Sequence, residues 1–152
     1  MKAWIMVLAL VLAAPVVAQA QSSVAKIEAR DAWARLPVDG AKSTTAYLEI
    51  VNLTNTADRL LGASSAWADR VTLQHMGMEG YDMKTKVVPF LKIGGHKSIK
   101  LHPGEYQLKL EGLTQVLKPD LKIPITLRFE NAGRVEIEAS VSNQKLGNLD
   151  DR

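Results

Sequence analysis

Short segments with alternating apolar and polar residues, separated by turn residues, set the fold class of this chain. In Thr44 to Asn52, apolar Ala46, Leu48 and Ile50 recur with a period of two, which is typical of a half-buried β-strand. Similar segments follow at short intervals, bounded by Gly, Pro, Asn or Asp. The expected strands cover residues 24–36, 44–52, 60–64, 71–75, 83–88, 98–101, 106–110, 123–129 and 135–141. About nine short strands without a long helical pattern predict an all-β protein, an antiparallel β-sandwich.

The N-terminal residues have the features of a secretory signal peptide. Lys2 precedes an apolar run from Ala3 to Val17, and Ala18-Gln19-Ala20 is a small-residue cleavage signature. The run of about 15 apolar residues is shorter than the roughly 20 that span a bilayer as a helix. We therefore expect a periplasmic protein without membrane insertion. The predicted organisation is a signal peptide at 1–20, a single domain at 21–141 and a polar C-terminal tail at 142–152.

Charge and cysteine content exclude several classes of function. Removal of Lys2 with the signal peptide lowers the number of Lys and Arg residues from 19 to 18, against 16 Asp and Glu. This near balance argues against nucleic acid as a partner. The absence of cysteine excludes disulfides, thiolate metal sites and a blue-copper centre. No nucleophile elbow, His-Glu-x-x-His motif or phosphate-binding loop occurs, so the chain is not expected to be an enzyme.

The most informative cluster of side chains is His75, Met76, Met78 and Met83. Thioether sulfur and imidazole nitrogen are ligands that Cu(I) prefers, so these residues are candidate copper ligands. Methionine also fills irregular cores, and in that interpretation Met83 and one other methionine pack inward while His75 stays solvated. Neighbouring strand residues point to opposite faces, which argues against convergence of all four side chains on one ion.

Several longer motifs occur along the chain in a characteristic order. They include Asp31-Ala32-Trp33-Ala34-Arg35, Leu101-His102-Pro103-Gly104-Glu105-Tyr106 and Pro124-Ile125-Thr126-Leu127-Arg128-Phe129-Glu130. Over residues 25–141 this order resembles the periplasmic copper chaperone (PCuAC) family. The resemblance implies a Greek-key, cupredoxin-like sandwich that carries copper in the periplasm toward copper-containing oxidases. A periplasmic or membrane copper protein would then be the partner.

The resemblance also implies where a copper site would lie. The family uses a His or Met, a Met eleven positions later, and a His-x-Met pair after a further gap of 21 residues. Without a gap, these positions fall on Gln74, Thr85, Gln107 and Lys109. Amide and hydroxyl oxygens are poor ligands for Cu(I), and a protonated lysine has no lone pair to donate. The family's Cu(I) site is therefore expected to be lost, with no tightly bound cofactor.

Three functions remain open at this stage. The first is a PCuAC-like protein with an accessory or binding role in copper homeostasis or delivery. The second is an active copper metallochaperone that uses the relocated cluster of His75, Met76, Met78 and Met83. The third is a metal-independent protein-interaction module that pairs through an exposed strand edge. The oligomeric state is not predicted by any feature of the sequence.

Overall fold

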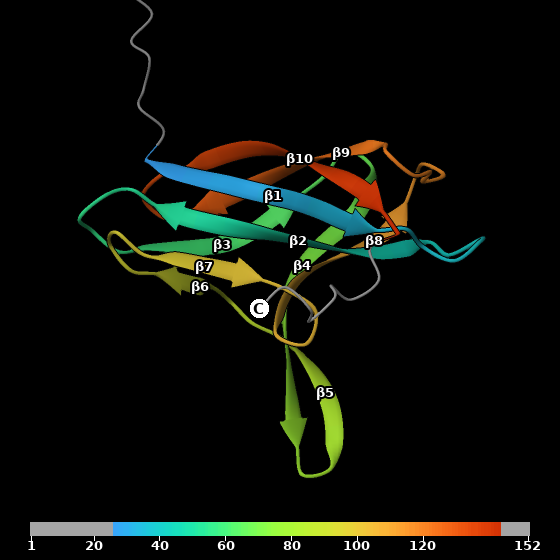
Figure 1. Cartoon of the computed structure of the whole chain (residues 1–152), viewed down its shortest axis with the longest axis horizontal. Helices are drawn as coiled ribbons and strands as arrows, with labels where there is room; N and C mark the ends of the chain where they lie inside the picture. Colours follow the sequence, from blue (N-terminus) through green and yellow to red (C-terminus); the bar gives the residue numbers. More distant parts are fainter. Residues whose placement is uncertain (1–25, 144–152) are drawn as a thin grey trace, which may run out of the picture.

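Ten β-strands make up the regular structure of residues 26–143, which are the residues that this computed structural model describes (Figure 1). The strands are β1 (Ile27–Arg35), β2 (Ser43–Asn52), β3 (Asp58–Ser64), β4 (Ala68–Glu79), β5 (Asp82–Val87), β6 (Leu91–Ile93), β7 (Ser98–Leu101), β8 (Tyr106–Leu113), β9 (Lys122–Phe129) and β10 (Arg134–Ser142). The predicted all-β class is confirmed. None of the described residues belongs to a helix that is long and apolar enough to cross a membrane. The predicted signal peptide and residues 144–152 of the predicted tail lie outside the described range.

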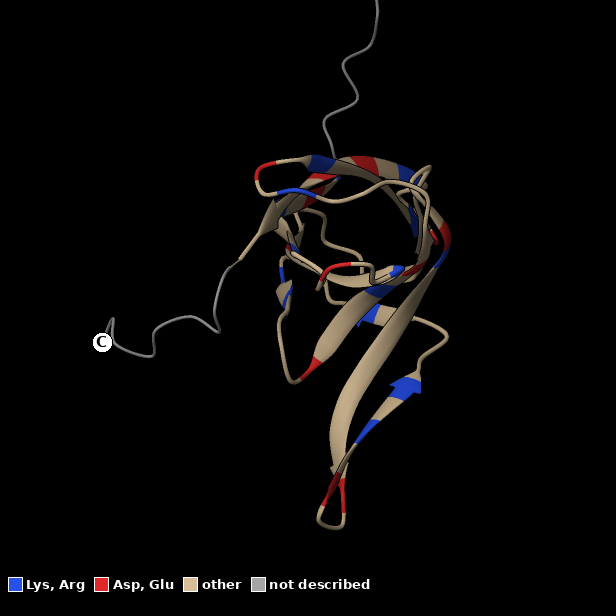
Figure 2. Cartoon of the chain, turned by 90° about the vertical axis from the view of Figure 1, so that its right-hand side faces the viewer, with Lys and Arg blue, Asp and Glu red and all other residues tan. Residues whose placement is uncertain are grey.

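The strands are connected in the order β5-β4-β8-β2-β1-β10-β9-β3-β6, and β7 pairs with the second half of β2. Neighbouring strands are antiparallel except for β1 and β10, which run parallel. The sheet curves so that one of its faces surrounds the core, and Figure 2 shows the strands enclosing the interior. The architecture is therefore the predicted β-sandwich, with one parallel pair added.

Alternation along the strands builds the core. Ala46, Leu48 and Ile50 of β2 are all buried, as their period of two predicts. Burial of such side chains is the main favourable contribution to folding. The largest fully buried side chains are Ile27, Leu48, Ile50, Leu60, Ile93, Leu101, Leu108, Leu110, Ile123, Ile125, Leu127 and Val141.

The structure corrects the predicted boundaries in one region that matters for function. The strand expected at residues 71–75 is much longer, and only Gly80 and Tyr81 separate β4 from β5. The methionine cluster therefore lies within two paired strands and not at a corner beyond a strand end. Pairing with β5 holds residues 76–79 in the sheet, and this tertiary contribution is not visible in the local pattern. In addition, β6 was not predicted because it has only three residues, and Ser142 ends β10 instead of beginning a tail.

A buried carboxylate fixes β3 against the turn between β9 and β10. Asp58 is 4% exposed, and its Oδ1 accepts hydrogen bonds from the backbone N–H groups of Arg59 at 2.7 Å and Asn131 at 2.9 Å. Its Oδ2 accepts a third from the N–H of Ala132 at 2.8 Å. Hydrogen bonds to an ionised acceptor are stronger than neutral ones. Because two of the donors lie more than 70 residues away in the sequence, Asp58 joins distant parts of the sandwich.

We expect Asp58→Asn to lower the free energy of unfolding by about 1–3 kcal/mol, because an amide group replaces one acceptor and leaves a backbone donor unpaired. Urea unfolding at neutral pH measures the difference. The matched control is Asp39→Asn, at an exposed position in the turn after β1, which should change stability by less than about 0.5 kcal/mol. Equal stability of the Asp58→Asn variant and the unmodified protein would contradict this role.

Candidate functional site

The β4–β5 hairpin extends away from the body of the sandwich, at the bottom of Figure 1. Glu79 pairs with Asp82, so the turn has only two central residues. Gly80 occupies the first of them with φ of +67°, which is the conformation that glycine provides in tight hairpin turns. All six residues of β5 are exposed. The hairpin therefore presents its side chains to solvent on a strand that only β4 supports.

The strand register assigns each residue of this region to one of two faces. Leu73 of β4 lies opposite Leu108 of β8, and both are buried in the core. Residues that alternate with them must point away from the core. This outer face carries Thr72, Gln74, Met76 and Met78 of β4, Met83, Thr85 and Val87 of β5, and Gln107 and Lys109 of β8. All four positions expected from the family resemblance therefore share one face.

Two of these four side chains are in direct contact. Gln74 lies opposite Gln107, and Nε2 of Gln107 donates a hydrogen bond to Oε1 of Gln74 at 3.0 Å. Nε2 of Gln74 in turn donates to Oγ1 of Thr72 at 3.2 Å. Gln107 is only 8% exposed although it is on the outer face. A pair of hydrogen-bonded amides thus occupies two of the positions that the family resemblance assigns to copper ligands.

The other two positions lie on opposite sides of this amide pair. Thr85 is opposite Met76, one step toward the hairpin tip, whereas Lys109 is opposite Thr72, one step the other way. Their partners Met76 and Thr72 are four residues apart on β4, which separates Thr85 from Lys109 by about 13 Å along the strand direction. The short hydroxyl side chain of Thr85 cannot span this distance, so Thr85 and Lys109 do not complete a compact set of donors.

Sequence reasoning missed two neighbours of the amide pair. Thr72 is the hydrogen-bond acceptor for Gln74, and its spacing of two from Gln74 on a strand is the signal that could have identified it. Tyr47 follows Ala46, which lies opposite Leu108, so Tyr47 is on the same face as Gln107. Tyr47 packs on Trp33 with ring centroids 4.7 Å apart. Burial raises the pKa of the Tyr47 hydroxyl, although Arg35 acts in the opposite direction.

His75 lies on the inner face, away from the methionines. Its ring packs on Tyr106 with centroids 4.7 Å apart, and a Cβ atom added at Gly77 would lie 3.2 Å from its Cε1. Lys86 lies directly opposite His75, and both Lys86 and Lys84 approach Glu79, at 3.8 and 3.0 Å. The register therefore places His75 on the opposite face of β4 from Met76 and Met78, although His75 and Met78 both line one small pocket with Glu79, Lys84 and Lys86.

The three methionines share the outer face of the hairpin. Met78 lies directly opposite Met83, and Met76 is two residues from Met78. The expectation that Met83 packs inward while His75 stays solvated is wrong. Met83 is 57% exposed and Met78 is 65% exposed, whereas His75 is half-buried against Tyr106. The reason is that the hairpin extends beyond the core, which leaves nothing for these methionines to pack into.

The two remaining histidines of the described residues are on separate loops. Nε2 of His102 pairs with Glu105 at 2.6 Å, while His96 is exposed with a positive φ of 52°. Between residues 26 and 143, no group of three or more His, Asp or Glu side chains is arranged to hold a metal ion. Methionine sulfur is a different type of ligand, so the methionines form a separate group of candidate ligands.

A family model covers nearly all of the described residues. The family model for LpqE-like lipoproteins matches residues 27–141. No curated protein sequence matches the chain.

Solved structures give the fold. The copper-bound PCuAC domain from PmoF2 superimposes with a TM-score of 0.66 at 24% identity, covering 78% of this chain and 94% of that domain. The apo PCuAC domain from PmoF2 has a TM-score of 0.62 at 26% identity, with 77% and 90% covered. Apo-DR1885 from Deinococcus radiodurans has a TM-score of 0.63 at 21% identity, with 97% and 99% covered. The sandwich is therefore of the cupredoxin-like type found in PCuAC domains.

A double-mutant cycle tests the amide pair on the outer face. Gln74→Leu and Gln107→Leu should each destabilise the protein, because each leaves a partly buried amide without its partner. The double variant should lose about 1 kcal/mol less than the two single losses together.

The control cycle uses Arg70 and Glu111, an exposed ion pair on the same two strands at 2.9 Å. Its coupling should decrease as salt is added, whereas that of the glutamines should not. Strictly additive losses for the glutamines would show that their hydrogen bond contributes nothing to stability.

Proposed function

Because the chain belongs to the LpqE-like lipoprotein family and folds as a PCuAC-type domain, we propose that it is an exported, non-enzymatic protein of copper homeostasis that has lost the family's copper site. In this proposal residues 1–20 direct export to the periplasm, and the residues that follow form a single domain whose last strand ends at Ser142. The protein would act in an accessory or binding role beside a periplasmic or membrane copper protein.

The observation that carries this proposal is the amide pair on the outer face. The hydrogen bond between Gln107 and Gln74 joins the two positions that the family resemblance assigns to imidazole or thioether ligands. Oε1 of Gln74 already accepts a hydrogen bond from Gln107, and Nε2 of Gln74 donates one to Thr72, so the carboxamide of Gln74 is engaged on both sides. Copper would have to displace this network and would gain only hard oxygen donors in return.

Lys109 adds an electrostatic argument. An ammonium group one step from Gln107 on the same face repels an approaching cation, and it has no lone pair to offer. Thr85 provides a hydroxyl, which is a weak ligand for Cu(I). The four positions together therefore favour a surface that excludes Cu(I) and is available for a protein partner.

The strongest test is to restore the family residues. The variant Gln74→His, Thr85→Met, Gln107→His, Lys109→Met should hold one equivalent of Cu(I) against a strong chelator, whereas the unmodified protein should leave the copper with the chelator. The reason is that two imidazoles and two long, flexible thioethers would replace hard or cationic groups on one face. Chelator competition followed by metal analysis after desalting measures both.

The control variant is Gln115→His with Lys118→Met, which adds the same ligand types at exposed positions in the loop before β9. It should retain no copper. One equivalent of Cu(I) held by the unmodified protein would disprove the loss of the site. A folded four-residue variant that fails to bind would show that the assumed register is wrong.

A second candidate function is favoured by the arrangement of the methionines. Met76, Met78 and Met83 place three thioethers on one face of the exposed hairpin, with Met78 and Met83 directly opposite each other. Three soft ligands can hold Cu(I) weakly without the help of His75. The protein would then act as a low-affinity copper carrier at the hairpin and not at the family position.

Titration with Cu(I), followed through the methyl signals of the methionines, tests this second candidate. Met78→Leu with Met83→Leu should abolish the shift of the Met76 methyl signal, because leucine keeps the side-chain volume but removes the sulfur. His75→Ala should leave binding unchanged, since its ring is on the inner face. Binding that survives the double leucine variant, or that is lost with His75, would exclude the three-methionine site.

A further inference from the structure

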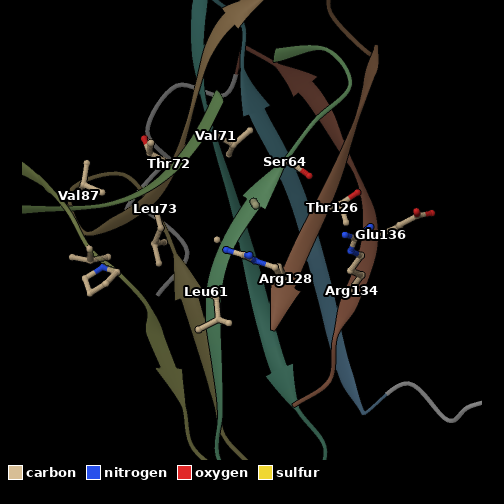
Figure 3. A pocket seen from close by; sticks show the side chains of 14 residues that line it. Leu61, Ser64, Val71, Thr72, Leu73, Val87, Thr126, Arg128, Arg134 and Glu136 are labelled. Atoms are coloured by element: carbon tan, nitrogen blue, oxygen red, sulfur yellow. The ribbon is translucent and has the colours of Figure 1, made fainter. Parts of the chain in front are cut away.

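A groove of about 570 Å³ lies between β3 and β4, on the side of the hairpin where β5 ends. We call it the β3–β4 groove, and Figure 3 shows the side chains around it. Its walls come from Leu61–Ser64 of β3 and Val71–Leu73 of β4, with residues 87–89 at one end and β9 and β10 at the other. It is separate from the amide pair of Gln74 and Gln107, neither of which lines it.

Both strands have an unpaired edge beside this groove. β6 pairs with β3 only from Asp58 to Leu60, and β5 pairs with β4 only from Gln74 onward. Within residues 26–143, no strand pairs with β3 at residues 61–64 or with β4 at residues 68–73 on these sides. Unpaired strand edges offer backbone donors and acceptors to an additional strand.

The free backbone groups of β4 can be assigned from one hydrogen bond. The carbonyl of Leu73 accepts from the N–H of Val88 at 3.0 Å, on the side of β4 away from β8. Backbone groups along a strand alternate between its two sides, so Val71, two residues earlier, points its N–H and C=O to that same side. An added strand could therefore continue along β4 from the point where β5 leaves it.

Two arginines and one glutamate, Glu136, line the groove and give it a net positive charge. Arg128 of β9 lies directly opposite Arg134 of β10, and both are exposed. Like charges directly opposite each other on a sheet are destabilising. Neither forms an ion pair with any residue from 26 to 143, although Glu136 also lines the groove. These guanidinium groups thus remain available to a carboxylate from outside.

Arg128 is aimed at the groove. Its Nη2 atom would lie 3.8 Å from a Cβ atom added at Gly62, so the side chain crosses over β3. In Figure 3 the guanidinium group extends into the space between Leu61 and Leu73. Leu61 is 36% exposed and Val87 is 66% exposed, so apolar surface lies beside the charge.

We propose that the β3–β4 groove binds an extended segment of a partner protein that carries an acidic side chain between apolar residues. The segment adds as a strand along β4 at Val71, its carboxylate pairs with Arg128 while Arg134 adds a second positive charge nearby, and its apolar residues cover Leu61 and Val87. Backbone pairing supplies affinity in this mode and the side chains supply specificity. The planar, five-donor guanidinium group suits a carboxylate because it can form two parallel hydrogen bonds. This inference does not depend on copper binding or on its loss.

The test begins with a phage-displayed library of random seven-residue peptides selected on the folded protein. Selected peptides should contain an Asp or Glu between apolar residues. A synthetic peptide of the selected sequence should bind about tenfold more weakly to Arg128→Gln, and more weakly still to Arg128→Gln with Arg134→Gln. Arg30→Gln is the matched control, because Arg30 is an exposed arginine on β1 that pairs with Glu28, and it should leave affinity unchanged.

Two further measurements separate strand addition from simple charge attraction. N-methylation of alternate peptide amides should abolish binding, because it removes the backbone donors that a strand needs. Bound peptide should shift the amide signals of residues 61–64 and 71–73. Selected peptides without an acidic residue, equal binding to the double glutamine variant, or full binding of the N-methylated peptide would each overturn the proposal. Displacement of the peptide by acetate at a concentration close to the dissociation constant of the peptide would also overturn the proposal, since the site would then bind only an anion.

Discussion

The pairing of Leu73 with Leu108 is the constraint on which the rest of this region depends. Both side chains are almost completely buried, at 3% and 0% exposure. A slip of β4 by one residue along β8 would turn Leu73 outward and bring Gln74 into the core opposite Leu108. The apolar interior thus excludes the other register. Every assignment of β4 side chains to the outer or inner face follows from this one contact.

Much of the fold can be predicted from alternation, because most strands have one buried face. β2 is an example, since its apolar residues at 46, 48 and 50 all enter the core. The parallel pairing of β1 with β10 could not be predicted in this way, because it joins the two ends of the described chain through tertiary contact alone. The second half of β4 was missed for a similar reason, since its partner β5 is entirely exposed and has no burial pattern.

The composition of the candidate site could be predicted better than its geometry. The spacing within the family resemblance selects positions 74, 85, 107 and 109, and their residue types are read directly from the sequence. The hydrogen bond between the two glutamines, however, requires the register of β4 on β8. The charged end of the β3–β4 groove was missed because the register of its hairpin is shifted. Arg128 lies two residues before the predicted turn at 130–133 and Arg134 one residue after it, so a symmetric hairpin would place Arg134 opposite Phe129, whereas the structure pairs it with Arg128. What the sequence does not contain is the direction of Arg128 across Gly62.

The projection of the β4–β5 hairpin from the sandwich also affects which substitutions this domain can accept during evolution. Side chains on β5 contact little of the core, so their replacement has a small effect on folding. Residues of the core, such as Leu108, do not have this freedom. Binding chemistry on the hairpin can therefore be gained, lost or exchanged by substitution while the scaffold stays intact. In this architecture mutational tolerance is concentrated where ligands would bind, and the same sandwich can support members with different ligand sets.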